Sequence, residues 1–322
     1  MKERQVYLDA AKGIGMLLIV CAHTGVSFPA PMLSSVKVAL FFLISGLFFI
    51  PKSSLPFKDY LKGDLMRIIV PFLVFYVFSY VLFYAGKAVV PGFTEMTEAK
   101  DVFDCFTQKQ YFNGPIWFLL SLFWIRLLCY FVERYVNKEW IRAIIVLCVG
   151  FSGFLLGRLE INLPLNIDSA LTFTPVFYAG TLVTRWSLLY RYSKVETGLF
   201  SGIFYLSCIP VTMTIQDSLN RYTGGGYLCM IYFCLVLCVA ILFFSKTFLN
   251  KSVLLSFIGR NSMWIMCTHH LIYRPVKIVF ERFCDIQSVN LWVMVATLVI
   301  CCVTAPLAEK FIPVAIGIRK KK

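Results

Sequence analysis

Residues 4–23, RQVYLDAAKGIGMLLIVCAH, form the most diagnostic segment of the chain, an apolar run with Asp9 and Lys12 near its start and His23 at its end. A helix that crosses a bilayer needs about 20 mostly apolar residues, and this run supplies them. Ionisable side chains inside a membrane helix are costly, so each one is by default a functional-site hypothesis. We therefore predict a transmembrane helix with a charged site at its inner end and a titratable site at its outer end.

The composition of the whole chain is that of an integral membrane protein. Of 322 residues, 59% are hydrophobic and 15% are charged, whereas a soluble domain has roughly 25% charged residues. Lipid requires backbone polar groups to be satisfied within helices or closed barrels, and the apolar stretches lack the alternation of barrel strands. We predict an all-α polytopic bundle of about ten transmembrane helices, with one domain over residues 1–322. The predicted spans are 6–27, 32–50, 68–86, 115–133, 141–157, 171–186, 199–215, 226–245, 254–273 and 291–312.

Lysine and arginine are distributed unevenly between these spans. Cytoplasmic segments collect such residues, and the segments on the side of the N-terminus hold roughly twice as many as those opposite. We therefore predict that both termini are cytoplasmic and that the chain lies in the cell (cytoplasmic) membrane. The net charge of +14 is then explained by topology and by attraction to anionic lipid headgroups, and it requires no nucleic-acid partner.

The 12 cysteines do not indicate a metal site or a disulfide framework. Most of them fall inside predicted spans, and no pair has C-x-x-C spacing, so buried small apolar side chains are the better interpretation. Only Cys105 and Cys284 lie in predicted outer loops, and the sequence leaves their pairing open. We expect no metal cofactor.

Three regions far apart in the sequence converge on the outer half of the predicted bundle. His23 ends the first span, Asn113 and Trp117 begin the fourth, and His269 and His270 lie in the outer half of the ninth. A lone histidine on an apolar face is more often a hydrogen-bonded core residue than a catalyst, and Trp117 alone would be read as an interfacial aromatic. Since neighbouring helix positions point in different directions, we expect at most one of His269 and His270 to share a cavity with His23.

A second set of polar residues falls at the inner ends of the spans. Asp9 and Lys12 share one helix face, so an ion pair between them is the simplest interpretation. Arg67 lies at the membrane boundary, where it either snorkels to the interface or grips a phosphate. The other members of this inner layer are Ser45, Arg260 and Glu309, the last as a carboxylate that neutralises one of the cations.

Two further features have structural interpretations of their own. The pair Ser45–Gly46 allows two helices to approach closely, whatever else it does. Arg126 falls in the middle of the fourth span, and a charge at that depth should face the bundle interior and have a partner or a water-filled cavity.

Several motifs occur together along the chain. They are YLDAAKG with His23, FFLISGLFF in the second span, Arg67 followed by Pro71, PIWFL in the fourth span, IGRNS…H in the ninth, and the late Glu309. As a set they resemble the membrane acyltransferase-3 family, close to the branch that includes fucose 4-O-acetylase-like proteins, over almost the full length. There are departures, because Lys12 stands where many members have Arg and Asp64 occupies the earlier place of an arginine pair of which only Arg67 remains.

The resemblance implies transfer of an acyl group, usually acetyl from acetyl-CoA, to a hydroxyl of a surface or exported glycan or lipid-linked sugar. The CoA phosphates would meet the inner cations Lys12, Arg67 and Arg260, and the pantetheine arm would extend between helices toward His23, about 21 Å from Asp9 along the first helix. His23 would act as general base, with direct transfer and an acetyl-imidazole intermediate both open.

Around His23, the outer residues Asn113, Trp117 and His269 would orient the sugar or stabilise the oxyanion. Two other functional classes stay open at this point. A transporter or flippase of a glycan or lipid-linked intermediate would also be basic inside and carry buried polar residues, and a regulatory membrane protein would keep the fold without activity.

Overall fold

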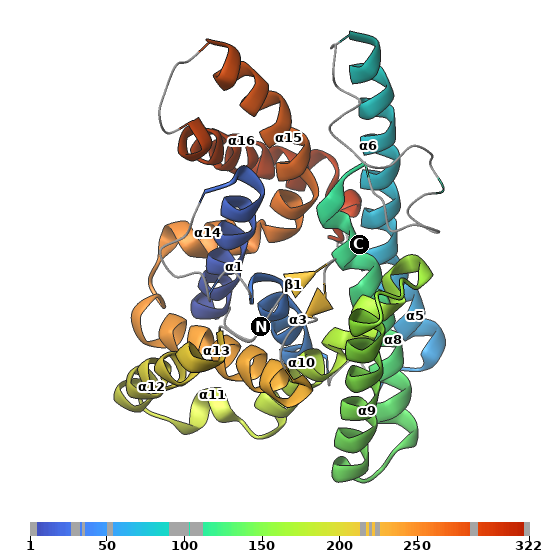
Figure 1. Ribbon diagram of the computed structural model, residues 1–322, viewed down its shortest axis with the longest axis vertical. Helices are drawn as coiled ribbons and strands as arrows, with labels where there is room; N and C mark the ends of the chain where they lie inside the picture. The colour runs from blue at the N-terminus through green and yellow to red at the C-terminus, as the bar shows by residue number, and fades with distance from the viewer. Residues whose placement is uncertain are drawn as a thin grey trace.

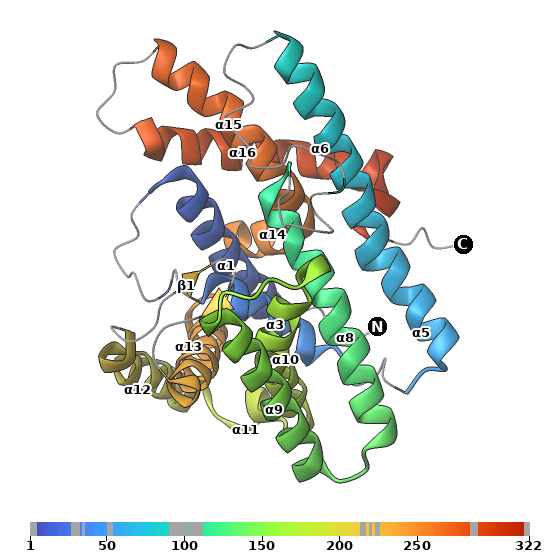
Figure 2. The same cartoon turned by 45° about the vertical axis from the view of Figure 1, so that its right-hand side comes forward.

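The computed structural model describes residues 5–26, 33, 36–49, 54–89, 103, 112–212, 217–218, 221–222, 226–283 and 289–318. The described chain is almost entirely helical (Figures 1 and 2), which confirms the all-α prediction. The helices are α1 (Val6–Thr24), α3 (Lys37–Leu47), α5 (Phe57–Asp64), α6 (Val70–Val89), α8 (Trp117–Tyr135), α9 (Glu139–Arg158), α10 (Ile167–Arg185), α11 (Leu188–Arg191), α12 (Lys194–Thr212), α13 (Tyr227–Phe248), α14 (Val253–Arg260), α15 (Ser262–Phe283) and α16 (Val289–Phe311). Strands β1 (Asp217–Ser218) and β2 (Arg221–Tyr222) pair antiparallel.

Six helical segments of the described chain are long and apolar enough to cross a membrane. They are Val6–Thr24, Phe57–Gly86, Gly114–Tyr135, Glu139–Arg158, Tyr227–Phe248 and Val289–Phe311. Five of them nearly coincide with predicted spans, and Phe57–Gly86 contains the predicted span 68–86. The predicted spans 32–50, 171–186 and 199–215 are also helical, as the shorter α3 and as α10 and α12. The chain is therefore a polytopic membrane protein.

The predicted span 254–273 is two helices and not one. α14 ends at Arg260 and α15 begins at Ser262, with the break at Asn261. The Asn261 side chain donates a hydrogen bond from Nδ2 to the carbonyl of Phe257 at 3.0 Å. A side chain that bonds to nearby backbone in this way competes with continuation of the helix. The break separates Arg260 from the helix that carries His269 and His270.

α1 is the central element of the bundle, where it packs against α3, α13, α14, α15 and α16 (Figures 1 and 2). Its closest neighbour is α14, because glycines let the two backbones touch. A Cβ at Gly13 would overlap the carbonyl of Leu255, and a Cβ at Gly259 would overlap the carbonyl of Asp9. This contact holds the C-terminal end of α14, and with it Arg260, beside the first turns of α1.

The second close crossing joins α3 to α10. A Cβ at Gly46 would overlap the carbonyl of Phe177, and a Cβ at Gly180 would overlap the carbonyl of Leu43. The packing interpretation of the Ser45–Gly46 pair is therefore confirmed for Gly46. Ser45, its neighbour, is only partly buried.

The helix that carries Arg67 changes its winding just before Pro71. Residues Leu65–Ile69 form a π-helical turn between α5 and α6, and the N–H of Val70 donates to the carbonyl of Leu65. Proline has no N–H to donate to the carbonyl four residues earlier, which here belongs to Arg67. The wider turn accommodates that missing bond and continues the helix, leaving the Arg67 side chain exposed.

The ten cysteines that the structure describes are free thiols. They are Cys21, Cys129, Cys148, Cys208, Cys229, Cys234, Cys238, Cys267, Cys301 and Cys302. Cys105 and Cys284 lie outside the described residues, so their pairing stays open.

Candidate active site

All three histidines of the chain meet at the end of α1. The centroid of the His23 ring lies 5.2 Å from that of His269 and 5.3 Å from that of His270, and 6.5 Å from the ring of Tyr273. The expectation that at most one of His269 and His270 would reach His23 is therefore wrong. The centroids of the His269 and His270 rings are 6.4 Å apart. The His23 ring packs against both, although His269 and His270 are adjacent residues that point in different directions from α15.

The three rings differ in exposure. His269 is 0% exposed and His270 is 6% exposed, whereas His23 is only partly buried. His23 is thus the member of this group that is accessible from outside the protein core. We call His23, His269, His270, Asn113 and Arg274 the histidine cluster.

The end of α1 is held in place immediately after His23. Gly25 adopts a left-handed conformation with φ of 74° and returns its N–H to the carbonyl of Cys21. A glycine in this conformation is a common helix terminator. The side chain of Asn290, at the start of α16, donates to the carbonyl of Gly25 at 3.3 Å. These bonds fix the last turn of α1 and therefore the position of the imidazole.

Asn113, which was expected at the level of His23, lies against α15, the helix that carries His269 and His270. It is 0% exposed, and its Nδ2 donates to the carbonyl of Cys267 on α15 at 2.7 Å. Its Oδ1 is buried and has no hydrogen-bond partner among the described residues. Gly114 follows it, and a Cβ there would lie 3.7 Å from the His270 ring. The 3-10 turn Gly114–Ile116, which precedes α8, thus lies against the ring of His270.

Trp117 is the first residue of α8 and is 7% exposed. Its described ring contact is with Phe118, at 6.5 Å between centroids. No ring contact in the described part of the chain joins Trp117 to a histidine. The structure therefore brings His269 to His23 and Asn113 to the backbone of α15 beside the buried histidines, and it leaves Trp117 at the edge of the site.

Hydrogen bonding determines which nitrogen of His269 carries the proton. Its Nδ1 lies 2.7 Å from the carbonyl of Ile265, which only accepts, so Nδ1 carries the hydrogen. In the neutral ring Nε2 is then an acceptor, and this atom is buried without a partner in the described residues. Two buried acceptors, Asn113 Oδ1 and His269 Nε2, are therefore available to a ligand that donates hydrogen bonds, such as an alcohol.

Sequence reasoning assigned no role to His270, Tyr273 or Arg274. Arg274 lies one turn beyond His270, and one of its guanidinium nitrogens is 3.3 Å from His270 Nε2. The i, i+4 spacing of His270 and Arg274 was the signal in the sequence, because such residues are neighbours on a helix surface. Lys37 and Arg274 also lie close enough to His23 to act on it electrostatically.

The charged site at the other end of α1 is built around an ion pair. Lys12 Nζ lies 3.3 Å from Asp9 Oδ1, as the spacing predicted. The Lys12 ammonium is also 5.8 Å from the centroid of the Phe48 ring, one turn beyond Ser45 on α3. This contact brings the turn that contains Ser45 next to Lys12.

The remaining predicted members of the inner layer are solvent-accessible. Arg260 is exposed at the end of α14, beside the turn of α1 that contains Asp9, and Arg67 is exposed on the π-helical turn. Glu309 is exposed near the end of α16. The described partner of Lys12 is Asp9 and not Glu309, so the expected neutralising role of Glu309 is not confirmed for Lys12.

Arg126 has the partner that its depth required. Its Nε and one terminal nitrogen donate to the two carboxylate oxygens of Asp64, at 2.8 Å and 2.7 Å. Its guanidinium carbon lies 5.5 Å from the ring centroid of Phe49 and 5.9 Å from that of Tyr60. A bidentate pair of this kind is among the stronger polar contacts in proteins. The presence of Asp64, where the family motif has an arginine, is thus explained by its ion pair with Arg126 on α8.

In the described part of the chain, no group of three or more His, Cys, Asp or Glu side chains has the arrangement of a metal site.

Comparison with protein families agrees with this arrangement. The family model described as an acyltransferase domain, acyltransferase 3, matches residues 5–308. No curated protein and no solved structure matches the chain. An acyl-CoA donor is typical of this family. The chain belongs to the acyltransferase 3 family and is a multi-pass membrane O-acyltransferase.

Proposed function

We propose that the protein transfers an acetyl or other short acyl group from cytoplasmic acyl-CoA to a hydroxyl of a cell-surface or exported glycan or lipid-linked sugar, in the cell membrane, with His23 as general base. One observation carries the proposal. An accessible imidazole lies among buried, unpaired polar atoms at one end of α1, and a charged site occupies the other end.

The spacing of the two sites supports a donor that enters from the cytoplasm. Asp9 and His23 are 14 residues apart in one uninterrupted helix, a separation of about 21 Å at 1.5 Å per residue. This length suits an extended pantetheine arm whose thioester is delivered to His23. Both termini of the chain are then cytoplasmic.

The cations of the inner end suit the phosphates of CoA. Arg67 and Arg260 are exposed, and a guanidinium binds phosphate through two parallel hydrogen bonds. Lys12 adds a third positive charge, held in place by Asp9. We assign Ser45 to the lining of this site and Glu309 to its rim, where its carboxylate neutralises one of the cations other than Lys12.

The chemistry needs one proton acceptor at the outer end. His23 takes the proton from the acceptor hydroxyl while the hydroxyl oxygen bonds to the thioester carbonyl carbon. The tetrahedral intermediate then breaks its carbon–sulfur bond, and the CoA thiolate takes the proton from His23. A variant of this scheme passes the acyl group through His23 itself as an acyl-imidazole.

The acceptors near His23 suit recognition of a sugar. Asn113 Oδ1 and His269 Nε2 each receive a hydrogen bond from a sugar hydroxyl and so orient the attacking oxygen. This role differs from oxyanion stabilisation, which requires donors. Trp117, at the edge of the site, packs against the sugar ring.

The proposal is tested with membranes that contain the full-length protein. Given labelled acetyl-CoA and polysaccharide extracted from cells that lack the gene, wild-type membranes release free CoA and label the polysaccharide, whereas His23→Ala membranes do neither. Label that stays on the protein without polysaccharide identifies the acyl-imidazole route. If acetyl-CoA is not consumed while the glycan crosses the membrane, the protein is a transporter and the proposal fails.

A further inference from the structure

His270 presents a polar atom that the scheme above does not use. Its ring is 5.3 Å from the ring of His23 and is buried. Its Nδ1 is buried and has no hydrogen-bond partner within the described residues. The large majority of buried side-chain polar atoms in proteins have a partner, so this nitrogen is available to a ligand.

Arg274 determines whether Nδ1 of His270 is a hydrogen-bond donor or an acceptor. A guanidinium carries N–H donors and no acceptor. Because Arg274 approaches His270 Nε2 at 3.3 Å, Nε2 must accept, and a hydrogen there would face the positive charge. The neutral imidazole therefore carries its hydrogen on Nδ1.

The unpaired nitrogens of the two neighbouring histidines thus differ, because that of His269 is a hydrogen-bond acceptor and that of His270 is a donor. Ile265 fixes His269 with an acceptor at Nε2, and Arg274 fixes His270 with a donor at Nδ1. Acceptors suit the hydroxyl of the incoming sugar. A donor suits an oxygen that becomes negatively charged, such as the carbonyl oxygen of a thioester under attack.

We propose that His270 donates its Nδ1–H to the acyl carbonyl oxygen as it becomes an oxyanion, and that Arg274 is the positioning residue that holds His270 in this tautomer. This inference rests on the proposed acyl transfer. As the hydroxyl oxygen bonds to the carbonyl carbon, the carbonyl electron pair moves onto the oxygen beside His270 and the hydroxyl proton moves to His23. His270 itself neither gains nor loses a proton.

The charges around the site favour the same assignment. Arg274 and Lys37 are the cations that act on His23, and positive charge close to a low-dielectric site stabilises a developing oxyanion. Arg274 acts through His270 and also through its charge. Arg274→Lys therefore retains both effects, and Arg274→Glu removes both.

The test compares two substitutions of His270 in full-length protein in membranes, with labelled acetyl-CoA and polysaccharide from cells that lack the gene. Asparagine places an N–H close to the position of Nδ1, whereas alanine places none. His270→Ala should lower kcat about 100-fold, since one oxyanion donor is worth about that much, and should change the KM for acetyl-CoA less than about threefold. His270→Asn should recover at least about tenfold of the lost kcat. Equal kcat for both variants, or a wild-type kcat in His270→Ala, overturns the inference.

The role of Arg274 is tested by measuring kcat for two substitutions in the same assay. Arg274→Lys keeps a charged donor opposite Nε2, whereas Arg274→Glu places an acceptor there and moves the hydrogen of His270 to Nε2. We expect kcat within about fivefold of wild type for lysine and at least about 30-fold lower for glutamate, with both proteins present at wild-type levels in the membrane. A glutamate variant with wild-type kcat overturns the positioning role, even where His270→Ala fails to fold.

Failure of this inference is distinguishable from failure of the proposed function. If wild-type membranes consume no acetyl-CoA, the proposed function fails. If wild type is active and His23→Ala is inactive while the His270 and Arg274 variants match wild type, only the inference fails.

Discussion

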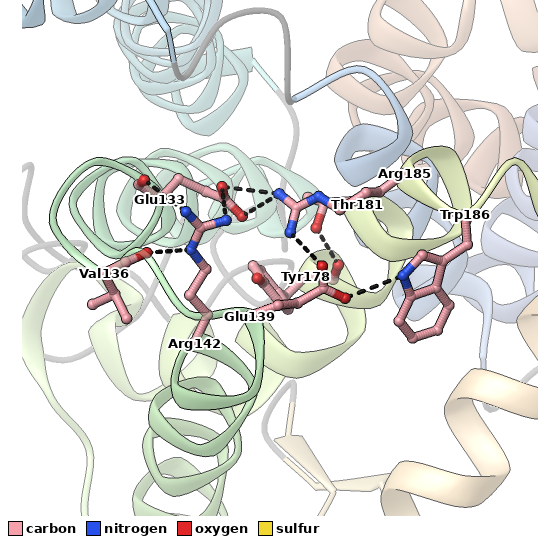
Figure 3. Close-up of polar contacts among 8 residues, drawn as sticks. All are labelled: Glu133, Val136, Glu139, Arg142, Tyr178, Thr181, Arg185 and Trp186. Carbon is pink, nitrogen blue, oxygen red and sulfur yellow. Dashed lines mark hydrogen bonds and ion pairs between the residues drawn. The ribbon is translucent and has the colours of Figure 1, made fainter.

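The histidine cluster and a second polar cluster, at the ends of α8, α9 and α10, are built in opposite ways. In the second, which we call the Glu133 network, Glu133 binds Arg142 at 2.7 Å and Arg185 at 2.8 Å. Arg185 also lies 3.3 Å from Glu139, which accepts a hydrogen bond from the Trp186 indole at 3.1 Å (Figure 3). Each charge in this network faces an opposite charge, whereas the histidine cluster leaves three buried polar atoms without protein partners in the described chain.

The difference indicates what each cluster is for. An ion network in which each charge faces an opposite charge stabilises the contact between helices. Unpaired buried groups destabilise the fold, so they persist where a ligand satisfies them. The Glu133 network joins helices, whereas the proposed function places the chemistry at the histidine cluster, so substitutions in the two clusters should affect different measurements.

The largest effect is expected at His23. His23→Ala removes the proposed general base and should lower kcat by about 10³-fold, within the range that acid–base catalysis contributes. Because the side chain is only partly buried, the melting temperature in detergent should change little. Turnover of labelled acetyl-CoA and a thermal melt on the same preparation provide the two values. Retention of more than a tenth of the wild-type kcat would contradict the assigned role.

The next largest effect is expected in the Glu133 network, and on stability. Glu133→Gln leaves Arg142 and Arg185 facing a neutral amide. Breaking a buried ion pair costs about 3–5 kcal/mol, and the side chains of these arginines are 14% and 22% exposed, so we expect a smaller loss of about 2–3 kcal/mol. Denaturant unfolding in detergent measures it. The folded fraction should keep the wild-type kcat, and a kcat loss above about tenfold would show that the network takes part in catalysis.

A smaller effect, on substrate affinity, is expected at the inner end of α1. Lys12→Met keeps the apolar stem of the side chain and removes the charge. The KM for acetyl-CoA should rise about tenfold because one charged phosphate contact is lost, while kcat stays within about threefold. Steady-state kinetics with acetyl-CoA as the varied substrate separates the two parameters. A change in kcat alone would assign Lys12 to the chemical step instead.

The smallest effect is expected at an exposed pair, which serves as a control for the other three. Lys277 lies 3.6 Å from Glu281 at i, i+4 spacing, and both side chains are exposed. Such a pair contributes about 0.3–0.5 kcal/mol. Lys277→Ala should therefore leave kcat, KM and the melting temperature at wild-type values within error. A marked loss would mean that the end of α15 contacts a substrate or lipid.

Much of the candidate site was predictable because it lies on single helices. The hydropathy of residues 6–27 and the positions of Asp9, Lys12 and His23 predict one helix with a polar site at each end, and α1 has that form. Asn113 and His269 were predicted at the level of His23 because each occupies a corresponding depth in its own span. A partner or a water-filled cavity was expected for Arg126, but the sequence did not identify the partner as Asp64.

Hydropathy and helical periodicity are local properties, so the amino-acid order was enough to establish an all-α membrane protein and the ion pair of Asp9 with Lys12. The folded arrangement of helices was needed for everything that depends on crossing angles and on backbone contacts between distant segments. It brings both His269 and His270 against the ring of His23, pairs Asp64 with Arg126, and breaks the helix at Asn261. The hydrogen bonds of Ile265 and Arg274 to the two histidines, and therefore their tautomers, are visible only in three dimensions, because a sequence specifies which atoms are present and not which of them remain unpaired.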